Sequence, residues 1–368
     1  MRITIIQGAC LPVPPLRGGA VERIWDRMGR EFALAGHDVT HLSRAVPELP
    51  NEEVRNGVHH LRLRGFDQPA NGIWLKILDL FYSRRAARLA PSADIVVTNT
   101  FWTPLMLKPA NGAIYVDVQR MPKGQMRFYS RAARLRANSE AVREAILAEV
   151  PSARSRVTVI PNPLSEVPAE SAHWETRPKR VLYAGRLHPE KGIGLLLQAW
   201  HRIRKIPRHA DWELQLIGPV ETAGGGGGRV WLDQLLTRYG DERVTITPPV
   251  FDSEILGKTY EQARLFVYPS VAAKGETFGL AVLEAMSHGT PPLVSSLACF
   301  ADFVRPPANG FVFDHTQRNA SELLATALDH ALKSDLQSMA AQCAKVRASH
   351  SPEVIAAQFL EDFEKLKR

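Results

Sequence analysis

The sequence predicts an α/β protein made of two Rossmann-like domains that face each other across a cleft. Three observations support this prediction. The chain has 368 residues, which is more than one ordinary core contains. Short β-rich runs alternate with helical patterns in both halves, as in doubly wound parallel sheets. A polar, helix-poor stretch between residues 161 and 179 interrupts the alternation, so we place one domain at 1–168 and the other at 169–350.

The first domain is predicted to open with a buried strand at Arg2–Gln7, a loop at Gly8–Gly19 and a helix at Ala20–Ala35. That helix carries Ile24, Trp25, Met28 and Phe32 at the spacing of a single apolar face. Further strands are predicted at 39–42, 95–98, 113–118 and 157–160, and a helix opens at 137–139. Strands separated by helices indicate parallel pairing.

The second domain repeats this alternation. Strands are predicted at 180–184, 213–217, 244–247, 265–268, 292–295 and 310–313, and helices at 194–203, 229–239, 254–263, 279–288 and 321–349. A last amphipathic helix is predicted after this domain, at 352–367. Five consecutive glycines at 224–228 indicate a mobile loop. Because ligands of open α/β sheets bind beyond the carboxyl ends of the strands, the loops that follow these strands are the candidate site.

Composition limits the function classes. Three cysteines lie far apart in no metal-like spacing, which favours a reducing compartment over a disulfide framework. No apolar run reaches the length of a membrane span, and the first residues lack the apolar region of a signal peptide, so we expect a cytoplasmic protein. Through residue 170 there are 23 Lys and Arg against 16 Asp and Glu, whereas the remainder is nearly neutral. This asymmetry indicates either an anionic partner for the first half or a merely soluble surface.

Two cations follow the strand at 180–184. Arg186 and Lys191 lie in a loop that leads into the next helix, whose amino-terminal end favours anions. Cations and a helix amino terminus at a sheet edge suit a diphosphate. The alternative is a solvated basic loop.

Two carboxylates follow the strand at 265–268. Glu276 is expected in the loop and Glu284 inside the next helix, on the same side. Carboxylates accept hydrogen bonds from sugar and ribose hydroxyls. Gly279 permits close backbone approach, and free N–H groups at Gly279 and Leu280 suit a phosphate. The alternative makes Glu276 a helix cap and Glu284 a surface charge.

These motifs, in this order, resemble the retaining glycosyltransferases of family 4, which have the GT-B fold. The resemblance rests on Arg186 and Lys191, on the Glu276-x7-Glu284 segment, and on Gly18-Gly19 before the first helix. Pro269-Ser270 and Gly289-Thr290-Pro291 fit the same pattern, so the resemblance covers nearly the whole chain. It implies that the first domain binds the acceptor, that the second binds the nucleotide sugar, and that a last helix at 351–368 packs back on the first domain.

The resemblance also implies a role for each site residue. Arg186 and Lys191 would hold the donor diphosphate, with Gly18 and Gly19 approaching it. Glu276 would contact the donor sugar, assisted by backbone N–H groups of Phe278, Gly279 and Leu280, and Glu284 would bind the ribose. No Asp-x-Asp is present, so we expect no metal and no other cofactor, the cations and helix dipoles taking the metal's place. The sugar would be transferred with retention from a UDP- or GDP-hexose to a saccharide or lipid-linked acceptor in bacterial polysaccharide synthesis.

One position departs from that family. Many relatives carry a His after the strand that corresponds to 113–118, whereas this chain has Asp117 and Gln119 there. We therefore do not carry over the His role, and we treat Asp117 as a candidate catalytic residue. If it is one, Asp117→Asn should lower turnover with little loss of fold.

Two segments are candidates for the acceptor or a membrane surface. Arg131, Arg134 and Arg136 follow a basic, aromatic run at 121–129 with helical spacing, which suits a pyrophosphoryl-lipid acceptor or anionic lipid, or else an ordinary helix. An apolar cluster precedes Arg84-Arg85, and we interpret it as core rather than as an interfacial patch. Its residues are Trp74, Leu75, Ile77, Leu78, Leu80 and Phe81.

Other functions are weighed against this reading. Gln7-Gly8-Ala9-Cys10 after the first strand is not the glycine pattern of a nicotinamide dehydrogenase. A sugar-nucleotide epimerase or phosphorylase on the same scaffold stays open, because fold does not fix function. Nucleic-acid binding rests only on the basic pI and has no accompanying motif.

Overall fold

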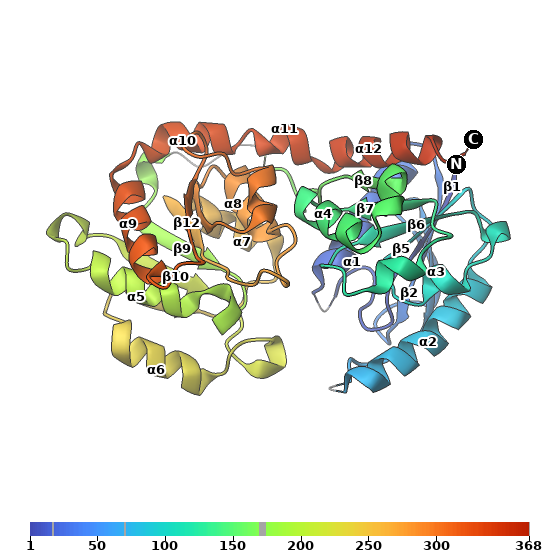
Figure 1. Cartoon of the computed structure of the whole chain (residues 1–368), viewed down its shortest axis with the longest axis horizontal. Helices are drawn as coiled ribbons and strands as arrows, with labels where there is room; N and C mark the ends of the chain where they lie inside the picture. The colour runs from blue at the N-terminus through green and yellow to red at the C-terminus, as the bar shows by residue number, and fades with distance from the viewer. Residues whose placement is uncertain (17, 70, 169–173, 368) are drawn as a thin grey trace. The chain divides into compact units, whose positions relative to one another are not determined.

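The computed structural model describes residues 1–16, 18–69, 71–168 and 174–367. The chain divides into two compact units (Figure 1). Unit 1 comprises Met1–Ser165 and Pro352–Arg368, and unit 2 comprises Glu166–Ser351. The sequence placed the corresponding boundaries at residues 168 and 350.

Unit 1 is built on an eight-stranded sheet in the order β3-β4-β2-β1-β5-β6-β7-β8. All neighbouring strands pair in parallel except β3 and β4, which are antiparallel. The strands are β1 (Arg2–Ile6), β2 (Asp38–Ala45), β3 (Glu52–Arg55), β4 (Val58–Arg64), β5 (Ile95–Thr98), β6 (Ala113–Val118), β7 (Arg134–Ala137) and β8 (Val157–Val159).

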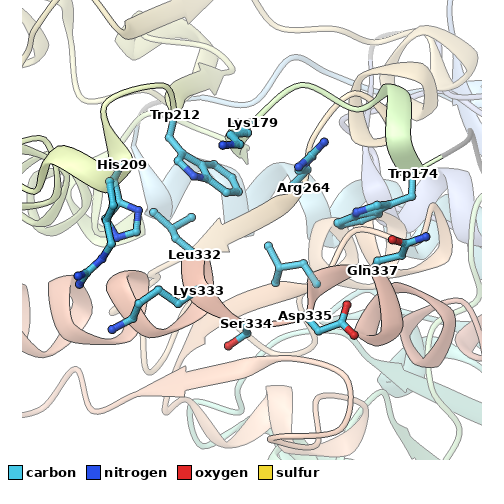
Figure 2. Close-up of a pocket in the computed structure, with 12 residues that line it drawn as sticks. Trp174, Lys179, His209, Trp212, Arg264, Leu332, Lys333, Ser334, Asp335 and Gln337 are labelled. Atoms are coloured by element: carbon cyan, nitrogen blue, oxygen red, sulfur yellow. The ribbon is translucent and has the colours of Figure 1, made fainter.

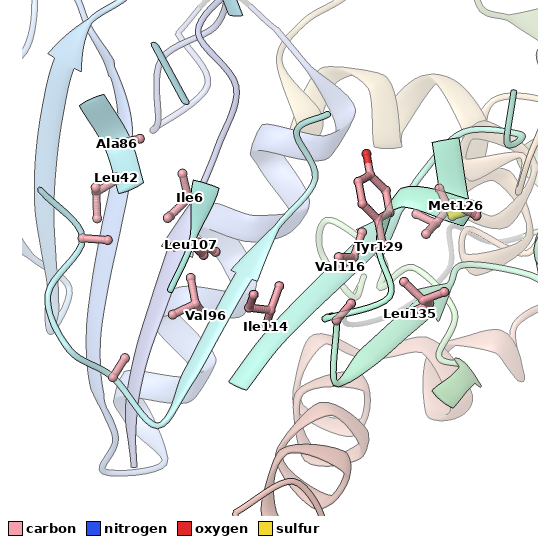
Figure 3. Packing of buried hydrophobic residues seen from close by; sticks show 14 of the residues in the cluster. Ile6, Leu42, Ala86, Val96, Leu107, Ile114, Val116, Met126, Tyr129 and Leu135 are labelled. Carbon is pink, nitrogen blue, oxygen red and sulfur yellow. The ribbon is translucent and has the colours of Figure 1, made fainter. Parts of the chain in front are cut away.

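Helices cover both faces of this sheet. They are α1 (Ala20–Leu34), α2 (Gly72–Leu89), α3 (Thr103–Met106), α4 (Glu140–Glu149) and α12 (Pro352–Glu364). On one face, side chains of α2 and α4 pack with Ile6, Val96 and Val116 (Figure 3). On the other face, α1 and α12 bury an aromatic group in which Trp25 and Phe359 lie 5.3 Å apart between ring centroids. The carboxy-terminal helix is therefore part of the core of unit 1.

Unit 2 has an all-parallel six-stranded sheet in the order β11-β10-β9-β12-β13-β14. The strands are β9 (Arg180–Ala184), β10 (Glu213–Ile217), β11 (Val244–Thr247), β12 (Leu265–Tyr268), β13 (Pro292–Ser295) and β14 (Phe311–Phe313). The helices are α5 (Ile193–Ile203), α6 (Arg229–Tyr239), α7 (Ser253–Glu261), α8 (Leu280–Ser287), α9 (Ala320–Lys333), α10 (Leu336–Cys343) and α11 (Val346–His350). The predicted α/β class with parallel sheets is confirmed in both units.

The predicted helix across residues 121–136 is wrong. Gln125–Phe128 forms one 3₁₀ turn, and Arg134–Ala137 is strand β7, paired in parallel with β6. Arg134 is ion-paired with Asp362 of α12 (Nη2 to Oδ1, 2.8 Å), and Arg136 is fully buried. These two arginines therefore connect β7 to neighbouring elements of unit 1 and do not form a basic helical surface.

The interpretation of residues 74–81 as core is wrong for three of the six side chains. These residues belong to α2, in which Trp74, Ile77 and Phe81 are exposed while Leu75, Leu78 and Leu80 are half-buried. The inner face is formed by Tyr82, Ser83 and Ala86. In the part of the chain that the structure describes, no helix has the length and apolarity needed to span a bilayer.

Candidate functional site

Three loops of unit 2 meet at the carboxyl edge of its sheet, after β9, β10 and β12. They meet because β9 lies between β10 and β12 with all three strands parallel. The backbone N–H of Gly185 donates to the carbonyl of Ile217 at 2.9 Å, which joins the first two loops. A Cβ on Gly218 would lie 1.8 Å from the carbonyl oxygen of Gly185, so this close approach requires glycine.

Lys191 and Glu276 form an ion pair at this edge. Lys191 ends a 3₁₀ turn at Pro189–Lys191, and Gly192 in left-handed conformation then starts α5. The ammonium Nζ of Lys191 lies 2.6 Å from Oε2 of Glu276, although the two residues are 85 positions apart. Lys191 is 7% exposed and Glu276 9% exposed. The structure thus brings together a cation and a carboxylate that the sequence assigned separately to the donor.

Two tyrosines line the floor beneath this pair, and sequence reasoning missed both. Tyr183 and Tyr268 stack with ring centroids 5.6 Å apart, and Lys191 Nζ lies 5.5 Å from the ring centroid of Tyr268. Burial, and after it the charge of Glu276, raises the pKa of each tyrosine, so both stay neutral. In the sequence, each tyrosine is visible only as an aromatic residue near the carboxyl end of a buried strand. Aromatic residues of the hydrophobic core occur at the same position, so the sequence did not distinguish the two roles.

Arg186 is the more exposed of the two cations. Its Nη2 lies 2.5 Å from Oε1 of Glu190, and its Nη1 donates to the carbonyl of Gly225 at 3.0 Å. Burial alone would raise the pKa of Glu190, but the hydrogen bond and charge of the Arg186 guanidinium outweigh it, and the pKa is lowered. The glycine run has a defined path in the structure, because the N–H of Gly227 also donates to the carbonyl of Leu187 at 2.8 Å.

The segment after Glu276 presents backbone to the site. Phe278 is 2% exposed and packs against Phe303, so its side chain belongs to the core. Gly279 adopts a left-handed conformation and precedes α8, which begins at Leu280. A Cβ on Gly279 would lie 2.4 Å from the ring of Phe300. The first N–H groups of α8 lack carbonyl partners within the helix and suit an anion.

Glu284 has a different environment from Glu276. It lies on α8 and is half-buried, and the hydroxyl of Tyr260 donates to its Oε2 at 3.4 Å. The two carboxylates of the Glu276-x7-Glu284 segment therefore have different partners.

The predicted residues of unit 1 are placed on separate elements. Gly18 and Gly19 both have positive φ and precede α1, as expected of a tight loop. A Cβ on Gly19 would lie 2.3 Å from Oε2 of Glu22, whereas Gly18 has no heavy atom within 4 Å of that position. A side chain would therefore have room at Gly18 but not at Gly19. The positive φ would strain a side chain at either position.

Asp117 is sealed inside unit 1. Its Oδ1 lies 2.7 Å from Nη1 of Arg136, and its Oδ2 accepts from the indole N–H of Trp25 at 2.6 Å. Gln119 donates to both carboxylate oxygens, and the side chains of Asp117 and Arg136 are fully buried. This geometry favours a structural role and revises our expectation that Asp117→Asn would leave the fold intact.

The cavity in Figure 2 lies at the other end of the unit 2 sheet. Its volume is about 310 Å³, and Lys179, Trp212 and Arg264, which line it, each directly precede a strand. It contains none of the predicted donor residues. Within residues 1–16, 18–69, 71–168 and 174–367, no three His, Cys, Asp or Glu side chains gather as metal ligands.

Comparison with known proteins gives a family match for part of unit 2. Residues 178–334 match the model of the glycosyl transferases group 1. An uncharacterized glycosyltransferase of Methanocaldococcus jannaschii, MJ1607, is 33% identical over 36% of this chain and 31% of its own length. The putative glycosyltransferase YtcC of Bacillus subtilis is 24% identical over 90% of this chain and 83% of its own length.

Solved structures show the same fold. Sucrose-phosphate synthase from Thermosynechococcus elongatus superposes with a TM-score of 0.77 at 22% identity, over 99% of this chain and 98% of that one. Anabaena Alr3699/HepE, solved with UDP and glucose, gives a TM-score of 0.73 at 18% identity over 99% of both chains. The expected GT-B fold is therefore confirmed.

Proposed function

We propose that the chain transfers a hexose from UDP- or GDP-hexose to a saccharide or lipid-linked acceptor, because residues 178–334 match the model of the group 1 glycosyltransferases. The observation that carries this proposal is the Lys191–Glu276 pair at the carboxyl edge of the unit 2 sheet. The UDP bound by the Anabaena structure supports a uridine nucleotide.

The ion pair suggests how the donor enters. A diphosphate oxygen replaces the Glu276 carboxylate as the partner of Lys191, so that the charge of Lys191 remains compensated. Glu276 is thereby released to accept hydrogen bonds from the hydroxyls of the donor sugar. Arg186 adds a second cation once it leaves Glu190, and the amino-terminal ends of α5 and α8 add their dipoles. Charge that develops on the leaving diphosphate is then stabilised without a metal ion.

The finer parts of the proposal follow from family resemblance. Glu284 binds the ribose, and Gly18 and Gly19 let the first loop of unit 1 approach the diphosphate. Transfer retains the anomeric configuration through an oxocarbenium-like transition state, and the leaving phosphate accepts the proton of the acceptor. The setting is bacterial polysaccharide or lipopolysaccharide synthesis in the cytoplasm, with peripheral contact to the membrane. We assign Asp117 no role in the proposed chemistry, because its side chain is fully buried and paired with Arg136.

Thermal unfolding in the presence of UDP, GDP and ADP, with and without chelator, tests the donor site. One diphosphate should raise the melting temperature far more than the others, equally with chelator, and Lys191→Ala should abolish the shift. Lys258→Ala is the matched control, since Lys258 is an exposed lysine of unit 2 on α7. If no nucleotide stabilises the protein at millimolar concentration, or if Lys258→Ala loses the shift as well, the proposed site is wrong.

Product analysis separates transfer from the alternatives. An epimerase or phosphorylase would convert or cleave the donor without an acceptor, whereas the proposed enzyme needs an acceptor for rapid turnover. The proton NMR spectrum of the product then reports whether the anomeric configuration is retained.

A further inference from the structure

The outer face of α2 is apolar along its first half. Ile73 is 71% exposed, Trp74 57%, Ile77 39% and Phe81 61%. With 3.6 residues per turn these four side chains lie along one stripe of the helix. In Figure 1, α2 is the blue helix that lies on unit 1 next to α3.

This stripe is additional to the face that α2 uses for folding. Tyr82, Ser83 and Ala86 lie on the opposite side and are buried against the sheet. The apolar side chains of the outer face therefore do not contribute to the core of unit 1. Large side chains that gather on one exposed face mark an interaction surface, whereas single exposed apolar residues do not.

The same stripe is basic along its second half. Arg84, Arg85 and Arg88 are exposed, and helical spacing places them in line with Ile77 and Phe81. The one carboxylate of α2, Asp79, is half-buried and lies on the other side of the helix. The exposed face of α2 therefore combines apolar and cationic side chains and carries no carboxylate.

We propose that this face of α2 docks the protein on an anionic lipid surface. Ile73, Trp74, Ile77 and Phe81 enter the boundary between headgroups and acyl chains, and Arg84, Arg85 and Arg88 contact lipid phosphates. Tryptophan and phenylalanine beside arginine are the side chains that interfacial helices use for this purpose. A second copy docked through the same face of α2 would offer no carboxylates to pair with these arginines, whereas lipid phosphates would, so charge complementarity favours lipid.

Co-sedimentation of the full chain with vesicles tests the proposal. The protein should bind vesicles of equal parts phosphatidylcholine and phosphatidylglycerol, bind pure phosphatidylcholine weakly, and be released by high salt. Each arginine near an anionic surface increases affinity by roughly fivefold, so replacing Arg84, Arg85 and Arg88 together by Gln should weaken binding by about a hundredfold. The double variant Trp74→Ser, Phe81→Ser should weaken binding by at least about tenfold through lost apolar burial.

A matched control keeps the result specific. Val230→Ser combined with Phe251→Ser removes two side chains of unit 2 that are each 73% exposed, and should leave vesicle binding unchanged. All variants should keep the melting temperature and nucleotide-induced stabilisation of the wild type, because the changed side chains are exposed. The proposal is overturned if the wild type ignores anionic vesicles, or if the α2 variants bind like the wild type. It is equally overturned if ultracentrifugation shows a dimer that the α2 variants abolish, since a second copy would then cover this face.

Discussion

Two ion pairs, one in each unit, join residues that are distant in sequence, and they differ in what surrounds them. Asp117–Arg136 in unit 1 is fully buried, and Trp25 and Gln119 also donate to the carboxylate. Lys191–Glu276 in unit 2 lies at the carboxyl edge of a sheet, and both residues keep a small exposed fraction. The first pair has partners on every side, whereas the second can exchange one partner for a ligand. Burial of charge is common to both, and accessibility distinguishes a structural pair from a binding one.

The largest effect is expected at the sealed pair. Asp117→Asn leaves the Arg136 guanidinium without a counter-charge in the interior, which costs about 3–5 kcal/mol of unfolding free energy for a buried pair. Urea unfolding of the variant measures this cost. The matched control is Glu144→Gln, which breaks a surface pair with Arg143 and should change stability by less than about 0.5 kcal/mol. A variant as stable as the wild type but inactive would return Asp117 to the chemistry.

The accessible pair should respond with opposite effects on binding and on catalysis. Glu276→Gln removes the charge that competes with the diphosphate for Lys191, so UDP should bind at least as tightly as to the wild type. Turnover should fall about a hundredfold, because a contact to the reacting sugar is lost. Calorimetric UDP titration beside a steady-state assay measures both quantities. If UDP affinity and turnover fall together, Glu276 holds Lys191 in place for the nucleotide, and the proposed exchange of partners is wrong.

Asp79 in α2 is a third carboxylate for this comparison, and burial alone changes its pKa. Burial raises the pKa of Asp79 to about 6 from the ordinary 3.8. The folded state therefore binds the proton more tightly than the unfolded state, and the wild type gains stability as pH falls from about 6 towards 4. Asp79→Asn should stabilise unit 1 by about 2–3 kcal/mol at pH 7 and by almost nothing near pH 4. Denaturant unfolding at the two pH values tests this, and an equal effect at both would contradict it.

Parallel strands were the most predictable part of the fold. Five strands of unit 2 begin and end at the predicted residues. The central strands β9 and β12 and their neighbour β13 are buried and mostly apolar runs, which makes them easy to recognise. Strand β4 was missed, since Val58–Arg64 contains two histidines and two arginines. His60 and Arg62 are buried there only because neighbours accommodate them: His60 stacks on His41, and Arg62 donates to the carbonyls of Val13 and Pro50.

The candidate residues were predictable where a local motif contains them, but the pairing of a buried charge with a residue of a neighbouring strand was not predictable. Arg186, Lys191 and Glu276 were chosen from local motifs, and the structure places all three at one sheet edge. The charge that neutralises Arg136 comes from the neighbouring strand β6, which no local pattern reveals, so its helical spacing was misleading. Apolar periodicity likewise did not decide which face of α2 lies in the core, because both faces are apolar.

The smallest effect is expected at the partly exposed pair Arg186–Glu190. Both side chains are roughly two-fifths exposed, so Glu190→Gln should change stability by less than about 1 kcal/mol. The variant frees Arg186 from its carboxylate while the Gly225 carbonyl still accepts from it, and UDP should therefore bind slightly more tightly. Calorimetry at low and high salt measures the change, which should shrink as salt screens the charges. A large loss of UDP affinity would mean that Glu190 holds Arg186 in its binding position. The pair would then be neither a buried structural pair nor one that exchanges its carboxylate for a ligand, but a pair in which the carboxylate positions the cation.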